Sequence, residues 1–183
     1  IIIAFKKIDF QKGIFVSPWN GINNFKFLFA TKDAFIITRN TILYNIAFFI
    51  VGTICSIALA IFINEIRSKQ MKKIYQTLIL LPYLMSWVIV SYLLYVFLSG
   101  ETGLVNSSIL KPLGLPPVSW YQEKKYWPFI LIFMNLWKGA GYSMIIYLSS
   151  IVSISTDYFE AARIDGAGKW QQIRLITLPL LKP

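Results

Sequence analysis

The chain has 183 residues, 56% of them hydrophobic and only 14% charged, a composition that few soluble domains have. Its formal net charge of +10 comes from Lys and Arg residues that mostly flank apolar runs, as anchoring at a membrane surface requires. No DNA- or RNA-binding motif accompanies this charge, so nucleic acid is not an expected partner. Histidine is absent and the one cysteine, Cys55, lies in an apolar run, which excludes a disulfide framework and a thiolate metal site.

The first 39 residues are predicted to precede the first complete membrane span. Ile1–Phe5 looks like the tail of an earlier apolar segment, and the chain stops at Pro183 just as another begins. We therefore expect a fragment of a longer membrane protein. Residues 6–39 are polar and rich in turn-forming residues, and they are predicted to form an external connection.

Residues 41–63 are predicted to be the first complete span. They contain no charge and can cross a hydrocarbon core of about 30 Å at about 1.5 Å per residue. Small residues that permit close helix contact lie along this span at Gly52, Ser56, Ala58 and Ala60. The connection that follows, 64–76, holds a dense basic cluster at Arg67, Lys69, Lys72 and Lys73. By the positive-inside rule this connection is predicted to be cytoplasmic.

Residues 77–99 are predicted to be the second span, which returns the chain outward. Tyr83, Trp87 and Tyr92 lie on it at spacings of four and five residues. They are candidates for a sugar path, because aromatic rings stack against the apolar face of a pyranose. The same side chains also suit packing against neighbouring helices or anchoring at the membrane interface. The spacing alone leaves these alternatives open.

Residues 100–126 are predicted to be a second external connection, and residues 127–153 the third span. Asn135, Trp137 and Lys138 in the third span are further candidates for the substrate path. A lysine at the centre of a bilayer costs about 2.5–3.5 kcal/mol on insertion scales, so Lys138 should face protein or water. Three roles stay open for it: snorkelling to the outer surface, bonding to carbonyl groups of the bundle, or lining the path.

A polar connection at 154–175 separates the third span from the start of the next apolar segment at 176–183. Asp157 is followed three residues later by Glu160, which is the form of a capping box. This pattern predicts a helix that begins at about Tyr158.

The glycines of this connection predict where that helix stops. Gly166 tolerates a positive φ, so the helix should end by about Asp165. A second helix should begin near Lys169 and continue toward the next apolar run. The predicted result is a short helix, a glycine turn and a re-entry helix along a membrane face.

The same connection carries the pattern E-A-A, three residues, G, nine residues, I-x-L-P, which ends at Pro179. It resembles, at every defining position, the cytoplasmic loop of binding-protein-dependent ABC importer permeases. In that family the loop is the coupling helix, which docks in a cleft of the ATPase subunit. The resemblance gives this role to Glu160, Ala161, Ala162, Asp165 and Gly166. Without the resemblance, the same residues need only cap their own helices.

Two other stretches resemble the carbohydrate branch of this family, and within it the permeases for complex oligosaccharides. They are Ser17–Phe25, which contains W-x-G-x-x-N-F, and the 100–126 connection. The resemblance implies an all-α polytopic transmembrane bundle of the bacterial cell membrane, with three complete spans in this fragment. It also implies a second permease subunit, two ATPase subunits, an extracytoplasmic solute-binding protein, lipid contacts and a carbohydrate substrate. Neither the identity of the sugar nor its charge follows from it.

The resemblance implies a transport subunit without enzymatic activity of its own. The chain has no G-x-x-x-x-G-K-[ST] run, so ATP and Mg are expected in the partner ATPase and no cofactor is expected here. An ABC permease for amino acids, peptides or metals would share the loop but should lack W-x-G-x-x-N-F. A secondary transporter would explain the hydropathy but not the loop. A membrane-embedded enzyme would need clustered carboxylates, histidines or a nucleophile–base pair near a membrane face, whereas the eight acidic residues here are scattered and have no histidine partners.

Overall fold

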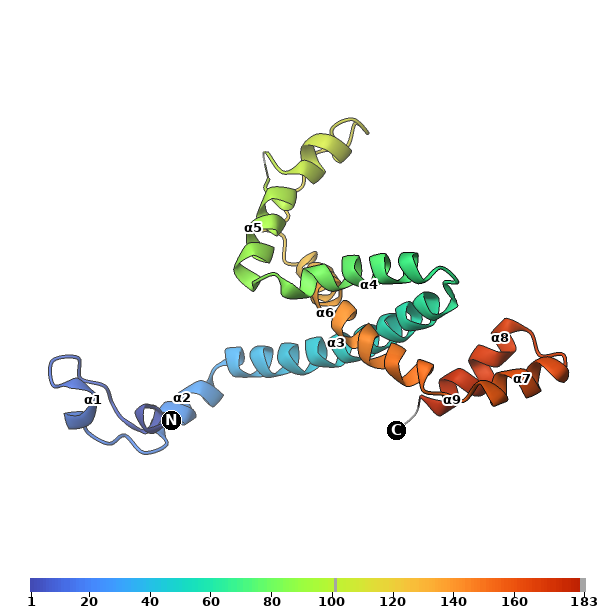
Figure 1. The fold of residues 1–183 in the computed structure, drawn as a ribbon. Helices are drawn as coiled ribbons and strands as arrows, with labels where there is room; N and C mark the ends of the chain where they lie inside the picture. The colour runs from blue at the N-terminus through green and yellow to red at the C-terminus, as the bar shows by residue number, and fades with distance from the viewer. Residues whose placement is uncertain (101, 182–183) are drawn as a thin grey trace. The chain divides into compact units, whose positions relative to one another are not determined.

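A computed structural model describes residues 1–100 and 102–181, apart from the side chains of residues 27 and 28. Every regular element in this described part is helical, which confirms the predicted all-α class (Figure 1). In chain order the elements are η1 (Ile2–Phe5), α1 (Gly13–Val16), α2 (Asn23–Ala30), α3 (Lys32–Glu65), α4 (Lys69–Leu84), α5 (Trp87–Leu98), η2 (Val105–Leu110), α6 (Trp127–Val152), α7 (Thr156–Ile164), α8 (Lys169–Gln172), η3 (Ile173–Thr177) and α9 (Leu178–Leu180). Residue 101 of the 100–126 connection and residues 182–183 of the last predicted segment lie outside the described residues.

Two helices, α3 and α6, are long and apolar enough to cross a membrane, and the bent pair α4 and α5 becomes a third candidate if it is counted as one span. The chain divides into two compact units, Ile1–Ile46 and Ala47–Pro183, which are described separately below. The count of two or three apolar spans agrees with the three spans predicted for this fragment.

In the first unit, the residues of the W-x-G-x-x-N-F pattern hold the chain start in place. Asn24 Nδ2 donates to the carbonyl oxygen of Lys6 at 3.1 Å, and the ring of Phe25 lies 5.1 Å from a phenylalanine ring of η1. The Lys6 ammonium in turn lies 5.4 Å from the centre of the Trp19 ring. Gly21 has φ 55°, a conformation that residues with a side chain rarely adopt. The pattern therefore has a local structural explanation.

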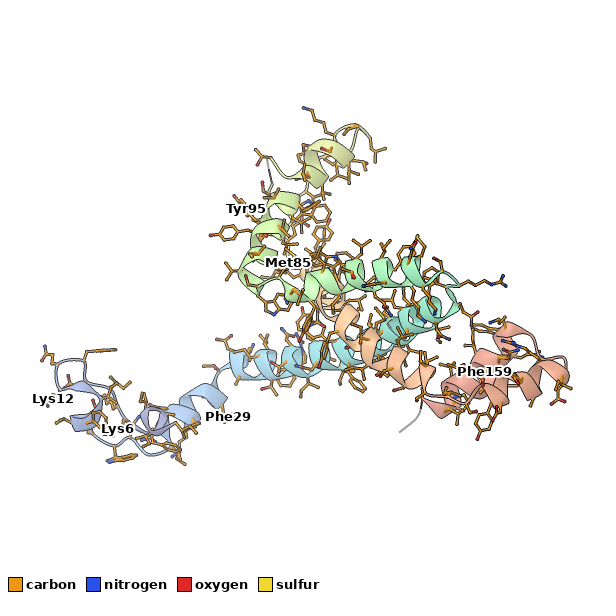
Figure 2. The ribbon with its side chains drawn as sticks, in the orientation of Figure 1. Lys6, Lys12, Phe29, Met85, Tyr95 and Phe159 are labelled. Carbon is orange, nitrogen blue, oxygen red and sulfur yellow. The ribbon has the colours of Figure 1, made fainter. Side chains whose placement is uncertain are left out.

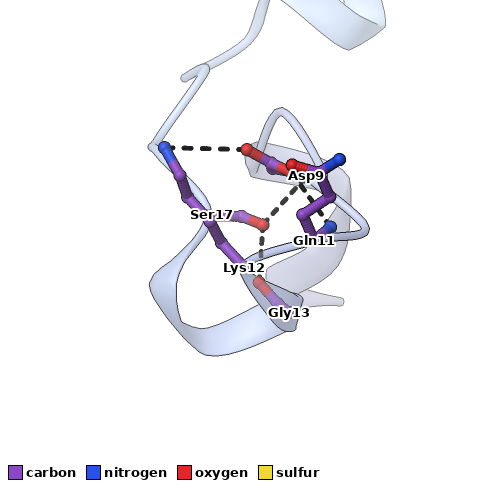
Figure 3. A network of polar contacts seen from close by, with 5 residues as sticks. All are labelled: Asp9, Gln11, Lys12, Gly13 and Ser17. Atoms are coloured by element: carbon purple, nitrogen blue, oxygen red, sulfur yellow. Dashed lines mark hydrogen bonds and ion pairs between the residues drawn. The ribbon is translucent and has the colours of Figure 1, made fainter.

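A polar turn between η1 and α2 is built around one serine (Figure 3). Ser17 Oγ accepts from the backbone N–H of Asp9 at 3.0 Å and donates to the carbonyl of Gly13 at 2.7 Å. The Asp9 carboxylate accepts from the backbone N–H of Gln11 at 3.0 Å and lies 3.7 Å from Lys12 Nζ. Because these bonds close the turn, this part of the predicted 6–39 connection is an ordered element.

The helix α3 begins earlier than the predicted span at 41–63. It starts at Lys32, within the predicted connection, and continues to Glu65. Residues 32–40 contain neither glycine nor proline, and Asp33 lies in the first turn, where a carboxylate favours the positive end of the helix dipole. The uncharged run located only part of this helix, because its first residues mix charged side chains with the apolar residues 34–37.

The predicted span at 77–99 is not one straight helix. It is divided between α4 and α5, which meet at an angle of 97° around Met85 (Figure 2). Pro82 has no backbone N–H, so the carbonyl four residues before it loses its helical donor. Ser86 Oγ then accepts from the backbone N–H of Ile89 at 3.3 Å and starts α5 as its N-cap. Proline and the following serine cap together produce the bend.

The core of the second unit lies between α3 and α6. Ser56, Ala60 and Met144 are fully buried there. Ser56 Oγ also donates to the carbonyl of Ala140 across the helix pair at 3.5 Å. Two of the four predicted small residues of α3 therefore form the close contact expected of them, whereas Ala58 is exposed on another face of the helix.

The helices α4 and α6 pack against each other at a glycine. A Cβ added to Gly141 would overlap the carbonyl oxygen of Ile79 and would lie 3.0 Å from the Cα of Leu80. A Cβ added to Gly139 would meet no atom of the described chain within 4 Å. Of the two glycines on α6, only Gly141 is required for this contact.

A buried asparagine organises the 100–126 connection. Asn106 is 4% exposed. Its Nδ2 donates to the carbonyls of Gly100 and Val118 at 2.7 and 2.9 Å. Its Oδ1 accepts from the backbone N–H of Val118 at 3.3 Å and from Trp120 Nε1 at 2.9 Å. One side chain thus joins the two ends of this connection.

Replacing Asn106 by aspartate is expected to loosen the connection. The isosteric carboxylate keeps the acceptor but loses both donated bonds and faces two carbonyls, so we expect a loss of about 1–2 kcal/mol in local stability. Limited proteolysis of the 100–126 connection in the membrane-inserted protein measures this, with Ser108→Ala as the exposed control. Unchanged cleavage in Asn106→Asp would show that the asparagine does not hold the connection together.

Candidate functional sites

The helix α7 begins at a serine cap and not at the predicted capping box. Ser155 is the N-cap, and its Oγ accepts from the backbone N–H of Asp157 at 3.3 Å. The helix therefore begins at Thr156, two residues before the predicted start at Tyr158. The proposed box between Asp157 and Glu160 is wrong, because Ser155 already occupies the capping position. The Glu160 side chain is consequently not used to cap its own helix.

The end of α7 is closed as the glycine spacing predicts. Gly166 has φ 80°, and its N–H donates to the carbonyl of Arg163 at 3.0 Å. The N–H of Ala167 donates to the carbonyl of Ala162 at 2.8 Å. These two bonds around a left-handed glycine form a Schellman motif, with Asp165 as the C-cap residue. The distance in sequence from Ala162 to Gly166 is thus fixed by the geometry of the helix end.

The second helix of the loop begins at Lys169, as predicted. The backbone N–H of Gly168 donates to Gln171 Oε1 at 2.8 Å, which satisfies one amide group at the start of α8. The buried Gln172 donates from Nε2 to the carbonyl of Ala167 at 2.9 Å. These side-chain bonds join α8 to the turn and hold α7 and α8 as one hairpin.

The residues assigned to coupling lie on one short, mostly exposed segment. Glu160, Ala161, Asp165 and Gly166 are exposed, and Ala162 is half-buried. Beside them, α7 and α8 border a hollow of about 380 Å³ together with the end of α3 and the start of α4. Charged and aromatic side chains in its wall are Glu65, Lys72, Phe159, Glu160, Arg163 and Lys169. Among the described residues, none forms an ion pair with Glu160.

One ion pair links the loop to the end of α3. Lys169 Nζ lies 2.7 Å from Glu65 Oε2, and both side chains are well exposed. Such exposed pairs contribute little, so Glu65→Gln and Lys169→Met should each lower stability by less than about 1 kcal/mol. A double-mutant cycle on thermal unfolding of the solubilised protein measures the coupling between them. A coupling energy well above 1 kcal/mol would show that the pair is a latch and not a surface contact.

A second cluster surrounds Lys138, at the bend between α4 and α5. Lys138 Nζ donates to the carbonyl of Tyr83 at 2.9 Å and lies 5.4 Å from the ring centre of Tyr83 and 5.3 Å from that of Trp87. The carbonyl of Tyr83 is at the end of α4, where the helix offers no further N–H. Of the roles left open for Lys138, the structure shows the bond to a carbonyl of the bundle.

Tyr142 belongs to the same cluster and was not among the predicted residues. Its ring stacks on that of Tyr83, with centroids 4.8 Å apart and an interplanar angle of 12°. Tyr142 follows Lys138 by four residues, so the two share a face of α6. That spacing was visible in the sequence, but the partner ring on α4 was not.

The other three path candidates lie apart from this cluster. Tyr92 is 70% exposed on α5. Asn135 borders a cavity of about 270 Å³ between α3 and α6. Trp137 borders two apolar cavities, one with α5 and η2 and one with α3 and α4. The structure therefore brings together Tyr83, Trp87 and Lys138 out of the six predicted residues.

A group of aromatic rings follows at the other end of α5. The Tyr121 ring lies 5.9 Å from that of Tyr95 and 5.4 Å from that of Trp127. Partial burial raises the pKa of the Tyr121 phenol, and the neighbouring Tyr95 phenol raises it further.

Residues 52–183 match the family described as binding-protein-dependent transport system inner membrane component. The polygalacturonan/rhamnogalacturonan transport system permease protein YteP of Bacillus subtilis is 37% identical over 185 aligned positions, which cover 100% of this chain and 56% of that protein. Protein LplB of the same species is 30% identical over 182 positions, covering 100% of this chain and 57% of that protein.

Two crystal structures of alginate transporters have the same fold. One, of a bacterial ABC transporter involved in the import of the acidic polysaccharide alginate, matches with a TM-score of 0.86 and 37% identity over 98% of this chain and 59% of that chain. The other, a bacterial alginate ABC transporter in complex with alginate pentasaccharide-bound periplasmic protein, has a TM-score of 0.79 and 38% identity over 88% of this chain and 56% of that chain. The chain thus spans little more than half the length of these relatives. It belongs to the family of binding-protein-dependent transport system inner membrane components.

Proposed function

We propose that this chain forms part of the permease subunit of an ATP-driven importer for oligosaccharides in a bacterial cell membrane. The observation that carries the proposal is the loop at α7 and α8. Its helix end is closed by its own backbone bonds, while Glu160 is exposed and has no ion-pair partner in the described chain. A rigid loop that presents an unpaired carboxylate is suited to docking on another protein.

The partner of this loop is a separate ATPase subunit that binds ATP and Mg. Glu160 pairs with a basic residue of the ATPase cleft, and the small side chain of Ala161 lets the helix seat closely. Closure of the two ATPase subunits pulls on the loop and moves the core helices between an outward-open and an inward-open state. A second permease subunit completes the path, and a solute-binding protein delivers the sugar from outside.

The substrate class comes from the relatives and from the cluster at the bend. Two of the similar proteins are named for polygalacturonan/rhamnogalacturonan and for alginate. In this chain, the exposed ring of Trp87, beside the Tyr83 ring that stacks on Tyr142, offers an apolar face to a pyranose. Both features support an oligosaccharide over an amino acid, a peptide or a metal ion.

A crosslink between loop and ATPase tests the proposal. The full-length permease, with Cys55→Ser to remove its native thiol in this segment and Ala161→Cys to add one on the loop, is purified with its partners. A second cysteine is placed in the ATPase cleft. We expect a disulfide whose yield changes with ATP, and ATP hydrolysis that an oligosaccharide-loaded binding protein stimulates. A folded complex without an ATPase partner or a crosslink would refute the coupling role and favour a secondary transporter.

A further inference from the structure

We propose that Lys138 recognises a carboxylate of the transported sugar, so that this permease selects acidic oligosaccharides over neutral ones. This inference rests on the proposed function and concerns the specificity of the same path. It depends on the position of one ammonium group, and not on the net charge of the chain, because most of that charge lies outside the apolar helices.

The position of Lys138 makes an unpaired charge costly. It lies eleven residues after Trp127 and fourteen before Val152, the two ends of α6. At about 1.5 Å per residue, these ends are about 16 and 21 Å away along the helix axis, so the ammonium is near the middle of the apolar helix. Charged groups at such depth face the protein interior or a water-filled path and are paired there.

The pairing of Lys138 is incomplete in the described chain. An ammonium has three N–H donors, and the carbonyl of Tyr83 accepts from one of them. The rings of Tyr83 and Trp87 provide cation–π contacts at 5.4 and 5.3 Å, which lower the energy of the charge without neutralising it. No described carboxylate is within ion-pairing distance of Lys138. Within the described chain, two of the three N–H donors of Lys138 therefore have no hydrogen-bond acceptor.

The rings around the ammonium match one kind of anion. The Trp87 side chain is 57% exposed, so its ring is accessible beside the half-buried Lys138, whereas one face of the Tyr83 ring is covered by Tyr142. A uronate residue carries a carboxylate on a pyranose ring, and so combines a charge with an apolar ring face. Stacking of that ring on an aromatic face would bring its carboxylate to the free donors of Lys138.

The contact with Tyr83 gives this recognition a further consequence. Lys138 satisfies a carbonyl at the end of α4, where the chain bends toward α5. A carboxylate that draws the ammonium away from this carbonyl would weaken a contact that stabilises the bend. Binding of an acidic sugar would then loosen the junction between α4 and α5.

An anionic lipid headgroup is the other possible partner for the Lys138 ammonium. The depth of Lys138 along α6 disfavours it, because headgroup phosphates lie at the ends of a membrane-spanning helix. The test separates the two sources by changing the sugar and the lipid independently.

The experiment uses the full-length transporter, with its partners, in vesicles. Uptake of an oligogalacturonide is compared with uptake of the same oligomer after reduction of its carboxylates to alcohols, with the binding protein saturated by each. We expect the wild-type protein to take up the acidic form about tenfold faster, the effect of about one charge-assisted hydrogen bond. Lys138→Gln should remove this preference by slowing uptake of the acidic form, whereas Lys138→Arg should retain it.

The matched control is Lys125→Gln. This removes an equal charge outside the apolar helices, where a hydrogen bond to Glu123 raises the pKa of Lys125, and both uptake rates should stay unchanged. Equal slowing of both sugars by Lys138→Gln would assign the residue a structural role only and overturn the inference. The inference would also be overturned if uptake by the wild-type protein changed with the phosphatidylglycerol content of the vesicles and did not differ between the two sugars. Equal wild-type uptake of both sugars would overturn the inference alone, whereas uptake of neither would overturn the proposed function.

Discussion

Replacing Gly141 by leucine is expected to prevent stable packing of α4 against α6. Even the Cβ of an alanine would overlap the carbonyl oxygen of Ile79 and would lie 2.8 Å from its carbonyl carbon. These are backbone atoms of a helix, so the clash is relieved only if the whole of α4 moves away. We expect Gly141→Ala to lower stability by about 1–3 kcal/mol and Gly141→Leu by about 3 kcal/mol or more.

The neighbouring glycine on the same helix provides the control for this prediction. Gly139 has open space around its Cβ position within the described chain. Since alanine favours a helix over glycine by about 1 kcal/mol, Gly139→Ala should be neutral or stabilising. The fraction of soluble, monodisperse protein that survives a heating series in detergent measures all three variants. Equal melting of Gly139→Ala and Gly141→Ala would show that α4 and α6 are not in close contact in the native protein.

Reversing the charge of Glu160 is expected to abolish sugar uptake while the subunit still inserts in the membrane. Glu160 is exposed and has no ion-pair partner in the described chain, so its own helix loses little when Lys replaces it. The proposed contact with a basic residue of the ATPase would instead become repulsive, which costs several kcal/mol at an interface. Uptake and ATP hydrolysis by the reconstituted complex, beside the amount of permease in the membrane fraction, measure both effects. Wild-type uptake by Glu160→Lys would contradict the coupling role.

A backbone change in the same loop should have the same result for a different reason. Gly166→Pro forces φ from 80° to about −65° and removes the N–H that donates to Arg163. The Schellman motif would open and the hairpin would lose its shape. Gly168→Ala is the matched control, because Gly168 has φ −68° and only a flexible glutamine oxygen 3.7 Å from its Cβ position. We expect no uptake from the first variant and near-normal uptake from the second.

The loop was predictable because its structure is local. Gly166 ends α7 where a left-handed residue was expected, and α8 begins at Lys169, because each bond that closes the turn joins residues a few positions apart. The same reasoning failed at the start of α7, where both Ser155 and Asp157 are good caps. Propensity does not choose between two caps that lie two positions apart, and the structure uses Ser155.

The bend and the cluster around Lys138 depend on contacts that the sequence does not display. Pro82 and Ser86 together indicate a break, but a long apolar run suggested one straight span instead. The bond from Lys138 to Tyr83 and the stack of Tyr142 on Tyr83 join residues more than fifty positions apart. Hydropathy and spacing place such residues on helices, but they do not say which helices meet.

The closed end of α7 has a consequence for how this loop changes in evolution. One residue inserted or deleted between Ala162 and Gly166 would rotate everything before it by about 100° relative to the turn. The Glu160 carboxylate would then point a quarter turn or more away from its present direction, although every functional residue would still be present. Natural variation should therefore replace side chains in this loop freely at Arg163 and Ile164 but leave its length unchanged.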